Sequence, residues 1–61
     1  MKRPPAVTDL IDELKRLPGI GQKTAERLSF FLMRSKADQA TKLANAIQNL
    51  KDKILTLYFH N

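Results

Sequence analysis

A proline and two glycines stand between two apolar, helix-like segments in the first half of this chain, at Leu17-Pro18-Gly19-Ile20-Gly21. Proline disfavours the helical conformation in the residue before it, and glycine can adopt backbone angles that other residues avoid. A helix that enters this pentapeptide therefore ends there, and a tight turn connects it to the next element. We accordingly expect a turn over residues 17–21 between two helices.

The segment before the turn has the spacing of an amphipathic helix. Its apolar residues recur at intervals of three and four positions, as on one helix face, and are Val7, Leu10, Ile11, Leu14 and Leu17. We predict a helix over about residues 5–16, entered through Pro4 and Pro5. Asp9 and Asp12 are expected near its positively polarised N-terminus.

The same periodicity resumes after the turn and predicts two more helices, over about residues 22–33 and 36–54. The second is apolar on more than one side, which is typical of a helix at the centre of a domain or at a subunit contact. Ser35 is suited to capping the N-terminus of the third helix. Residues 55–61 are expected to form a short tail. The expected fold is all-α, a single domain of three helices over residues 1–61.

Positive charge is concentrated around the turn. The chain has 61 residues, of which 11 are Lys or Arg and 6 are Asp or Glu, and its net charge is +5. Residues 15–36 contain six of the basic residues and one acidic residue, Glu26, so this segment holds an excess equal to that of the whole chain. Such a segment indicates a polyanionic partner such as nucleic acid, although a solvated helix face can be equally basic.

The composition argues against several classes of protein. No apolar run approaches the roughly 18 residues of a membrane span, and the basic start is followed by prolines and acidic residues, unlike a secretory signal. There are no cysteines for disulfides or thiolate metal sites. We therefore expect a cytoplasmic protein without membrane contact or cofactor. A chain this short buries only about 60% of its unfolded surface, which favours a homodimer.

The turn and the start of the second helix form the candidate binding site. Glycine leaves the amide groups unshielded at a helix N-terminus, where free donors and the helix dipole favour an anion such as a DNA phosphate. The arrangement resembles the helix-hairpin-helix motif of small SAM-like domains, which implies DNA binding. The predicted DNA-binding residues are Gly19, Ile20, Gly21, Gln22, Lys23, Thr24 and Arg27.

The roles expected within this site differ. Ile20 packs inward beside Leu17 and anchors the hairpin, while Lys23 and Arg27 add positive charge to the phosphate site. Contacts to phosphate carry no sequence information, so binding should be non-specific and steeply dependent on salt.

Nothing in the sequence indicates catalysis or a metal centre. His60 is the only histidine, and one histidine without cysteines does not form a metal site. Ser29 and Thr24 have no general base near them in the sequence. The aromatic residues could stack on bases, but their spacing favours core or subunit contacts; they are Phe30, Phe31, Tyr58 and Phe59. We predict that the chain is not an enzyme and has no catalytic or metal-binding residues.

The order of residues around the hairpin resembles the N-terminal domain of the RecR family of bacterial recombination mediators. The matching residues are Pro4-Pro5-x-Val7, then Leu10-Ile11-x-Glu13-Leu14-Lys15-x-Leu17-Pro18-Gly19-Ile20-Gly21-x-Lys23-Thr24-Ala25-x-Arg27-Leu28, then Leu32 and the segment from Ala40 to Ile54. The resemblance covers about residues 3–54 and implies a role in recombinational repair, in which the family acts with RecO and RecF to load RecA onto gapped DNA.

The same resemblance carries further implications for this chain. The positions that match the family's basic DNA-facing residues are Lys23 and Arg27. Family members form dimers and tetramers in part through this region, and their DNA partner implies a location at the bacterial nucleoid. They continue into a four-cysteine zinc finger and a Toprim domain, which this sequence lacks, so the functions of those parts are not carried over. We take the chain to be the N-terminal domain alone.

Three other functions fit parts of the sequence. An oligomerisation or protein-interaction module would use the basic face only for solubility and would not contact DNA. The DNA-anchoring hairpin of a nuclease, glycosylase or ligase would share the turn, but the Pro4-Pro5 entry and the long third helix disfavour it. A basic helix on a membrane surface is disfavoured because the charges flank a turn and do not line one continuous face.

Overall fold

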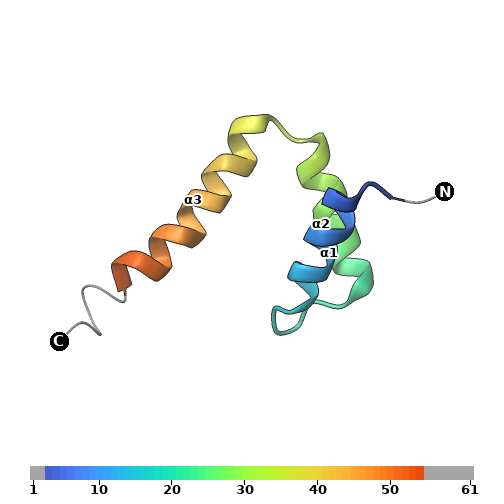
Figure 1. The fold of residues 1–61 in the computed structure, drawn as a ribbon, viewed down its shortest axis with the longest axis horizontal. Helices are drawn as coiled ribbons and strands as arrows, with labels where there is room; N and C mark the ends of the chain where they lie inside the picture. Colours follow the sequence, from blue (N-terminus) through green and yellow to red (C-terminus); the bar gives the residue numbers. More distant parts are fainter. Residues whose placement is uncertain (1–2, 55–61) are drawn as a thin grey trace.

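The computed structural model describes residues 3–54 and contains three helices in that range, with no strand. They are α1 (Pro5–Lys15), α2 (Gln22–Arg34) and α3 (Ala37–Ile54) (Figure 1). The prediction of an all-α, three-helix fold is confirmed, and each helix begins and ends within one residue of its expected bounds. The expected tail over residues 55–61, with His60 and two of the aromatic residues, lies outside the described residues.

Two prolines set the start of α1. Pro4 is in an extended conformation, and its carbonyl accepts hydrogen bonds from the amides of Val7 and Thr8, at 3.0 and 3.2 Å. Pro5 is the first helical residue, where its missing N–H costs nothing. The expectation for Asp9 and Asp12 is wrong, because the first turn of α1 holds no acidic residue and both lie further along the helix. The helix dipole therefore does not account for these two carboxylates.

A small core joins α1 to α2. Ile11 of α1 is 2% exposed, and the two residues buried on α2 are both small, Ala25 at 0% and Ser29 at 3%. Ala25 and Ser29 are four positions apart and lie on the same side of α2, which lets the two helices approach closely. The Ser29 hydroxyl has no hydrogen-bond partner within the described part of the chain. These contacts make α1 and α2 one antiparallel hairpin.

Helix α3 extends away from this hairpin. Figure 1 shows it as a separate arm, and every one of its residues is exposed. Its large apolar side chains are also open to solvent: Leu43 47%, Ile47 57%, Leu50 62% and Ile54 36%. The radius of gyration is 14.1 Å, against about 10 Å for a compact domain of this length. The amphipathic pattern of α3 is therefore present without a partner surface packed on most of it.

The corner between α2 and α3 is formed by Ser35 and Lys36. Ser35 has an extended backbone, and its hydroxyl donates a 2.7 Å hydrogen bond to the carbonyl of Leu32 in the last turn of α2. The prediction that Ser35 caps α3 is wrong, because this side chain bonds back to the preceding helix. Helix α3 begins two residues later, with the amide of Gln39 donating to the carbonyl of Lys36 at 3.0 Å.

Candidate nucleic-acid interface

The turn between α1 and α2 depends on a glycine at one position. The Ile20 amide donates to the Leu17 carbonyl at 3.2 Å and closes a four-residue turn with Pro18 and Gly19 at its centre. Gly19 has φ +81°, the left-handed region that glycine tolerates best. Proline followed by a glycine of positive φ is the signature of a type II turn. The sequence therefore specifies the hairpin through these two residues.

Gly21 has a different role from Gly19. Its backbone, at φ −93° and ψ −173°, is extended and open to any residue, so the conformational freedom that glycine allows is not used at Gly21. A Cβ atom added at either glycine would meet nothing within 4 Å. The missing side chain at Gly21 therefore leaves the backbone there accessible to a ligand. The turn itself does not require glycine at this position.

The first turn of α2 presents free amide donors. Gly21 precedes the helix and supplies no side-chain cap, while its carbonyl accepts from the Ala25 amide at 2.9 Å. The three backbone amides before that of Ala25 have no acceptor within residues 3–54; they belong to Gln22, Lys23 and Thr24. Free donors at the positive end of a 13-residue helix form a surface that favours an anion.

Lys23 and Arg27 lie one turn apart on α2. Both are exposed, and neither forms an ion pair with any described residue. Arg34 continues the series, because at about 100° per residue the three side chains fall within about 40° around the axis. We call Lys23, Arg27 and Arg34 the basic stripe; it runs about 16 Å along α2 at 1.5 Å per residue. Arg34 was missing from the predicted site, although its seven-residue spacing from Arg27 is visible in the sequence.

The other predicted site residues contribute less through their side chains. The Gln22 amide nitrogen Nε2 donates to Oε2 of Glu26 at 2.8 Å, so the side chain is engaged within the helix. Thr24 is exposed and lies about 100° around the axis from Lys23. Ile20 is half-buried, but Leu17 is 50% exposed, so the pair does not form the buried anchor expected from the sequence.

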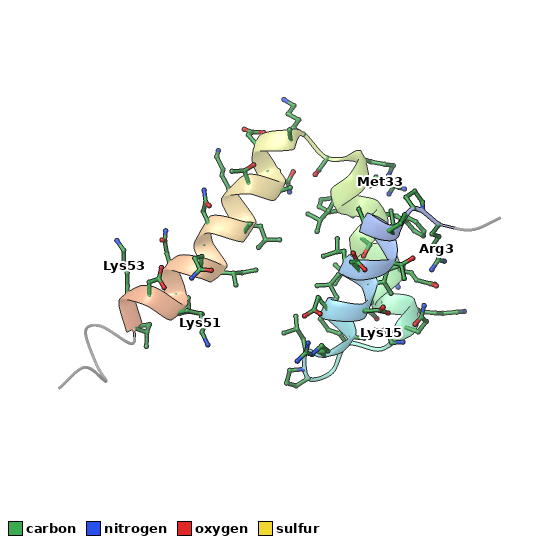
Figure 2. The ribbon with its side chains drawn as sticks, in the orientation of Figure 1. Arg3, Lys15, Met33, Lys51 and Lys53 are labelled. Atoms are coloured by element: carbon green, nitrogen blue, oxygen red, sulfur yellow. The ribbon has the colours of Figure 1, made fainter. Side chains whose placement is uncertain are left out.

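Glu26, the acidic residue of the basic segment, forms an ion pair with Arg3, which precedes α1. The Arg3 guanidinium forms a 2.9 Å ion pair with Oε2 of Glu26 and lies 5.4 Å from the centre of the Phe30 ring. Arg3 is seen beside the α1–α2 hairpin in Figure 2. The hydrogen bond from Gln22, then the one from Arg3, lower the pKa of Glu26 below its ordinary value of 4.5. The ion pair with Arg3 thus offsets the negative charge of Glu26, which stays ionised. No periodicity in the sequence indicates this long-range pairing.

Residues 3–54 contain neither a cluster of metal-ligating side chains nor a membrane-spanning helix. No group of three or more His, Cys, Asp or Glu side chains in that range could hold a metal ion. None of the helices described is both long enough and apolar enough to cross a membrane.

Comparisons with known proteins point to one family. The family model described as RecR, helix-hairpin-helix, matches residues 7–51. A protein named Recombination protein RecR from Herpetosiphon aurantiacus is 54% identical over 52 residues, covering 85% of this chain and 26% of the relative. Proteins of the same name from Rhodopirellula baltica and Koribacter versatilis are 51% and 53% identical, covering 80% and 74% of this chain and 25% and 23% of the relatives. The chain thus spans about a quarter of the length of the curated relatives it matches. No solved structure matches it.

Proposed function

The chain belongs to the RecR family through its helix-hairpin-helix domain, and on that premise we propose that it binds DNA through the phosphate backbone without sequence specificity. The hairpin supplies the central contact: one phosphate meets the amides at the start of α2, where the absent side chain of Gly21 allows close approach. Lys23 and Arg27 contribute charge beside it.

One observation carries this proposal more than any other. Three features lie in the N-terminal half of one helix: the free amides of α2, the open surface at Gly21, and two cations, Lys23 and Arg27, that form no ion pair within residues 3–54. Each feature alone is common in small helical proteins. Their coincidence favours an anion over a protein surface, because none of them offers an apolar contact.

A charge reversal tests the proposal with a matched control inside the same chain. The double variant Lys23→Glu, Arg27→Glu is expected to lose binding to a mixed-sequence duplex at low salt while keeping its helical content. The control is Lys51→Glu, Lys53→Glu, which changes the net charge equally at the far end of α3 (Figure 2). Its affinity is expected to fall only by the weaker, non-local effect of net charge. Equal losses in both variants, or undiminished binding in the first, would show that the hairpin is not the site.

The finer biological role follows from the family and is part of the proposal. We place the domain in recombinational repair at the bacterial nucleoid, in the cytoplasm, where the longer protein acts with RecO and RecF in loading RecA. It contributes binding and no catalysis, and it needs no cofactor of its own. Restoration of DNA-damage resistance by the full-length gene, and its loss in the same gene carrying Lys23→Glu and Arg27→Glu, is the expected result in a cell lacking RecR.

Self-association is a second role favoured by a specific observation. An open apolar groove of about 240 Å³ lies between α3 and the hairpin. It is lined by Leu10, Leu14, Leu32, Ala40, Leu43, Ala44 and Ile47. We propose that α3 of a second copy fills this groove, because the exposed apolar stripe of α3 has the length and chemistry to cover it. Such a dimer would present two hairpins to the two strands of a duplex.

Light scattering tests this second role. The chain is expected to have the mass of a dimer at micromolar concentration, and Ile47→Lys is expected to give a monomer whose α1–α2 hairpin remains folded. A strict monomer at high micromolar concentration would exclude a second copy as the occupant of the groove.

A further inference from the structure

A pocket at the corner between α2 and α3 shares only Arg34 with the site described above. Its volume is about 470 Å³, and it is lined by Phe31, Arg34, Ser35, Lys36 and Gln39. Phe31 is 50% exposed. The sequence favoured a core or subunit contact for this ring, but it lies outside the core formed by Ile11, Ala25 and Ser29.

The lining of this pocket combines an aromatic ring with positive charge. Arg34 and Lys36 form no ion pair with any described residue, and no carboxylate lines the pocket. Asp38, at the start of α3, pairs with Lys42 at 3.9 Å. The side-chain amide of Gln39 can both donate and accept hydrogen bonds. A flat ring, two cations and an amide together match a ligand that is planar, polar at its edge and negatively charged.

We propose that this corner binds one unpaired nucleotide of a DNA strand, with its base stacked on Phe31 and its phosphate held by Arg34 and Lys36. An unpaired base fits best, because the faces of bases inside a duplex are covered by their neighbours, whereas those of a single strand are free to stack on an aromatic ring. The pocket is a shallow, open depression, so a nucleotide would rest against its lining with one side still open to solvent.

The corner is continuous with the surface proposed for duplex binding. Arg34 belongs both to this pocket and to the basic stripe. Successive phosphates of one strand could therefore contact the cations of α2 from the hairpin as far as Phe31. The inference rests on the proposed function in naming DNA as the partner, but it uses different side chains. An acidic protein segment would use the two cations and would leave the face of the Phe31 ring without a planar partner.

Truncation of the ring is the first test. Phe31→Ala is expected to weaken binding of a twelve-residue oligothymidylate by about 5- to 100-fold, the range for loss of one stacked base, and to change duplex binding by less than about twofold. The matched control is Met33→Ala, which shortens a side chain that is 60% exposed and is labelled in Figure 2. At about 100° per residue, Met33 lies about 160° from Phe31 around the axis of α2. Equal affinity of the Phe31→Ala variant and the unmodified chain for oligothymidylate would overturn the proposal.

A spectroscopic test reports on stacking itself. The chain contains no tryptophan, so the Phe31→Trp variant carries a single indole whose emission reports on this position. Saturable quenching by oligothymidylate, and little quenching by a blunt duplex, is the expected result. An emission that shifts with protein concentration in the absence of DNA would show that a second copy covers the ring, and would overturn the proposal.

The two proposals fail separately in these experiments. If the Lys23→Glu, Arg27→Glu variant keeps full duplex affinity while the indole is still quenched by the single strand, the hairpin assignment is wrong and the corner stands. If the double variant loses duplex binding but oligothymidylate leaves the indole emission unchanged, the hairpin stands and the corner is wrong.

Discussion

The α1–α2 hairpin and α3 have the same kind of sequence pattern but very different surroundings. In the hairpin, the apolar face of α1 meets small residues of α2 and buries Ile11 almost completely. In α3, an equally regular stripe stays open to solvent, with Leu50 at 62% exposure. Periodicity shows that a helix has a face to bury, but it does not show what covers that face. The difference separates a part whose apolar face is covered within the chain from a part whose apolar face is exposed.

The largest expected effect contrasts one residue from each region. Ile11→Ala removes the one large apolar side chain of the hairpin core that is nearly fully buried, and should lower the free energy of unfolding by about 2 to 5 kcal/mol. Leu50→Ala in the exposed stripe should change it by less than about 0.5 kcal/mol. Urea denaturation of both variants, at a concentration where the chain is monomeric, measures the contrast. Similar losses in the two variants would mean that α3 packs on the hairpin in solution.

The two glycines of the turn give an intermediate effect and separate folding from binding. Gly19→Ala places a side chain at φ +81° and should cost about 1 to 2 kcal/mol of stability. Gly21→Ala has an unstrained backbone and should cost only about 0.5 kcal/mol, the preference for glycine over alanine before a helix. Its added methyl group lies where a phosphate would approach, so the loss in free energy of duplex binding should exceed the loss in free energy of unfolding. A Gly21→Ala variant with unchanged affinity would argue against close approach of the phosphate.

A smaller, stabilising effect is expected at the hydroxyl buried in the hairpin. Ser29→Ala removes an oxygen that has no hydrogen-bond partner among the described residues and adds a better helix former. The free energy of unfolding should increase by about 1 kcal/mol, which is measured as a rise in melting temperature. A decrease of similar size would show that the hydroxyl has a partner, such as water, in solution.

The smallest expected effect is the loss of stability at low pH that comes from Glu26. Because the pKa of Glu26 is lowered in the folded chain, its contribution to stability is present above the ordinary value of 4.5 and is lost as the pH falls through the lower folded value. Melting temperatures at pH 7 and pH 3 should therefore differ more for the unmodified chain than for Glu26→Gln. Identical differences would show that neither the Gln22 hydrogen bond nor the Arg3 contact lowers the pKa of Glu26 in solution.

The sequence predicted the parts of the fold that depend on local rules. Helix bounds, the turn at Pro18 and Gly19, and the exposed positions of Lys23 and Arg27 follow from periodicity, backbone preferences and charge. What it did not predict depends on contacts between distant residues: the pairing of Arg3 with Glu26, and the unpacked position of α3. The capping by Ser35 was wrong because a hydroxyl at a helix junction can bond to either helix, and only the backbone angles decide which.

The candidate site shows the same division. The glycine turn and its following lysine were recognisable because the motif is contiguous. Arg34 was not assigned to it, although its spacing from Arg27 is visible in the sequence. Phe31 was not assigned to it either, since its exposure depends on how α1 and α3 leave the two sides of α2. The spacing of the aromatic residues favoured a core or subunit contact for Phe31, and the structure places this ring outside the core.

Binding of the unmodified chain to a mixed-sequence duplex, measured over a range of salt concentrations, tests the central claim most directly. Phosphate contacts by the three cations of the basic stripe predict that the logarithm of the affinity falls with the logarithm of salt concentration, with a slope of about −2 to −3 for each chain bound and about twice that for a dimer that places both hairpins on the duplex. A second duplex of unrelated sequence should give the same line. Absence of binding at low salt, or a slope near zero, would contradict the claim and leave a protein-interaction module as the function of this domain.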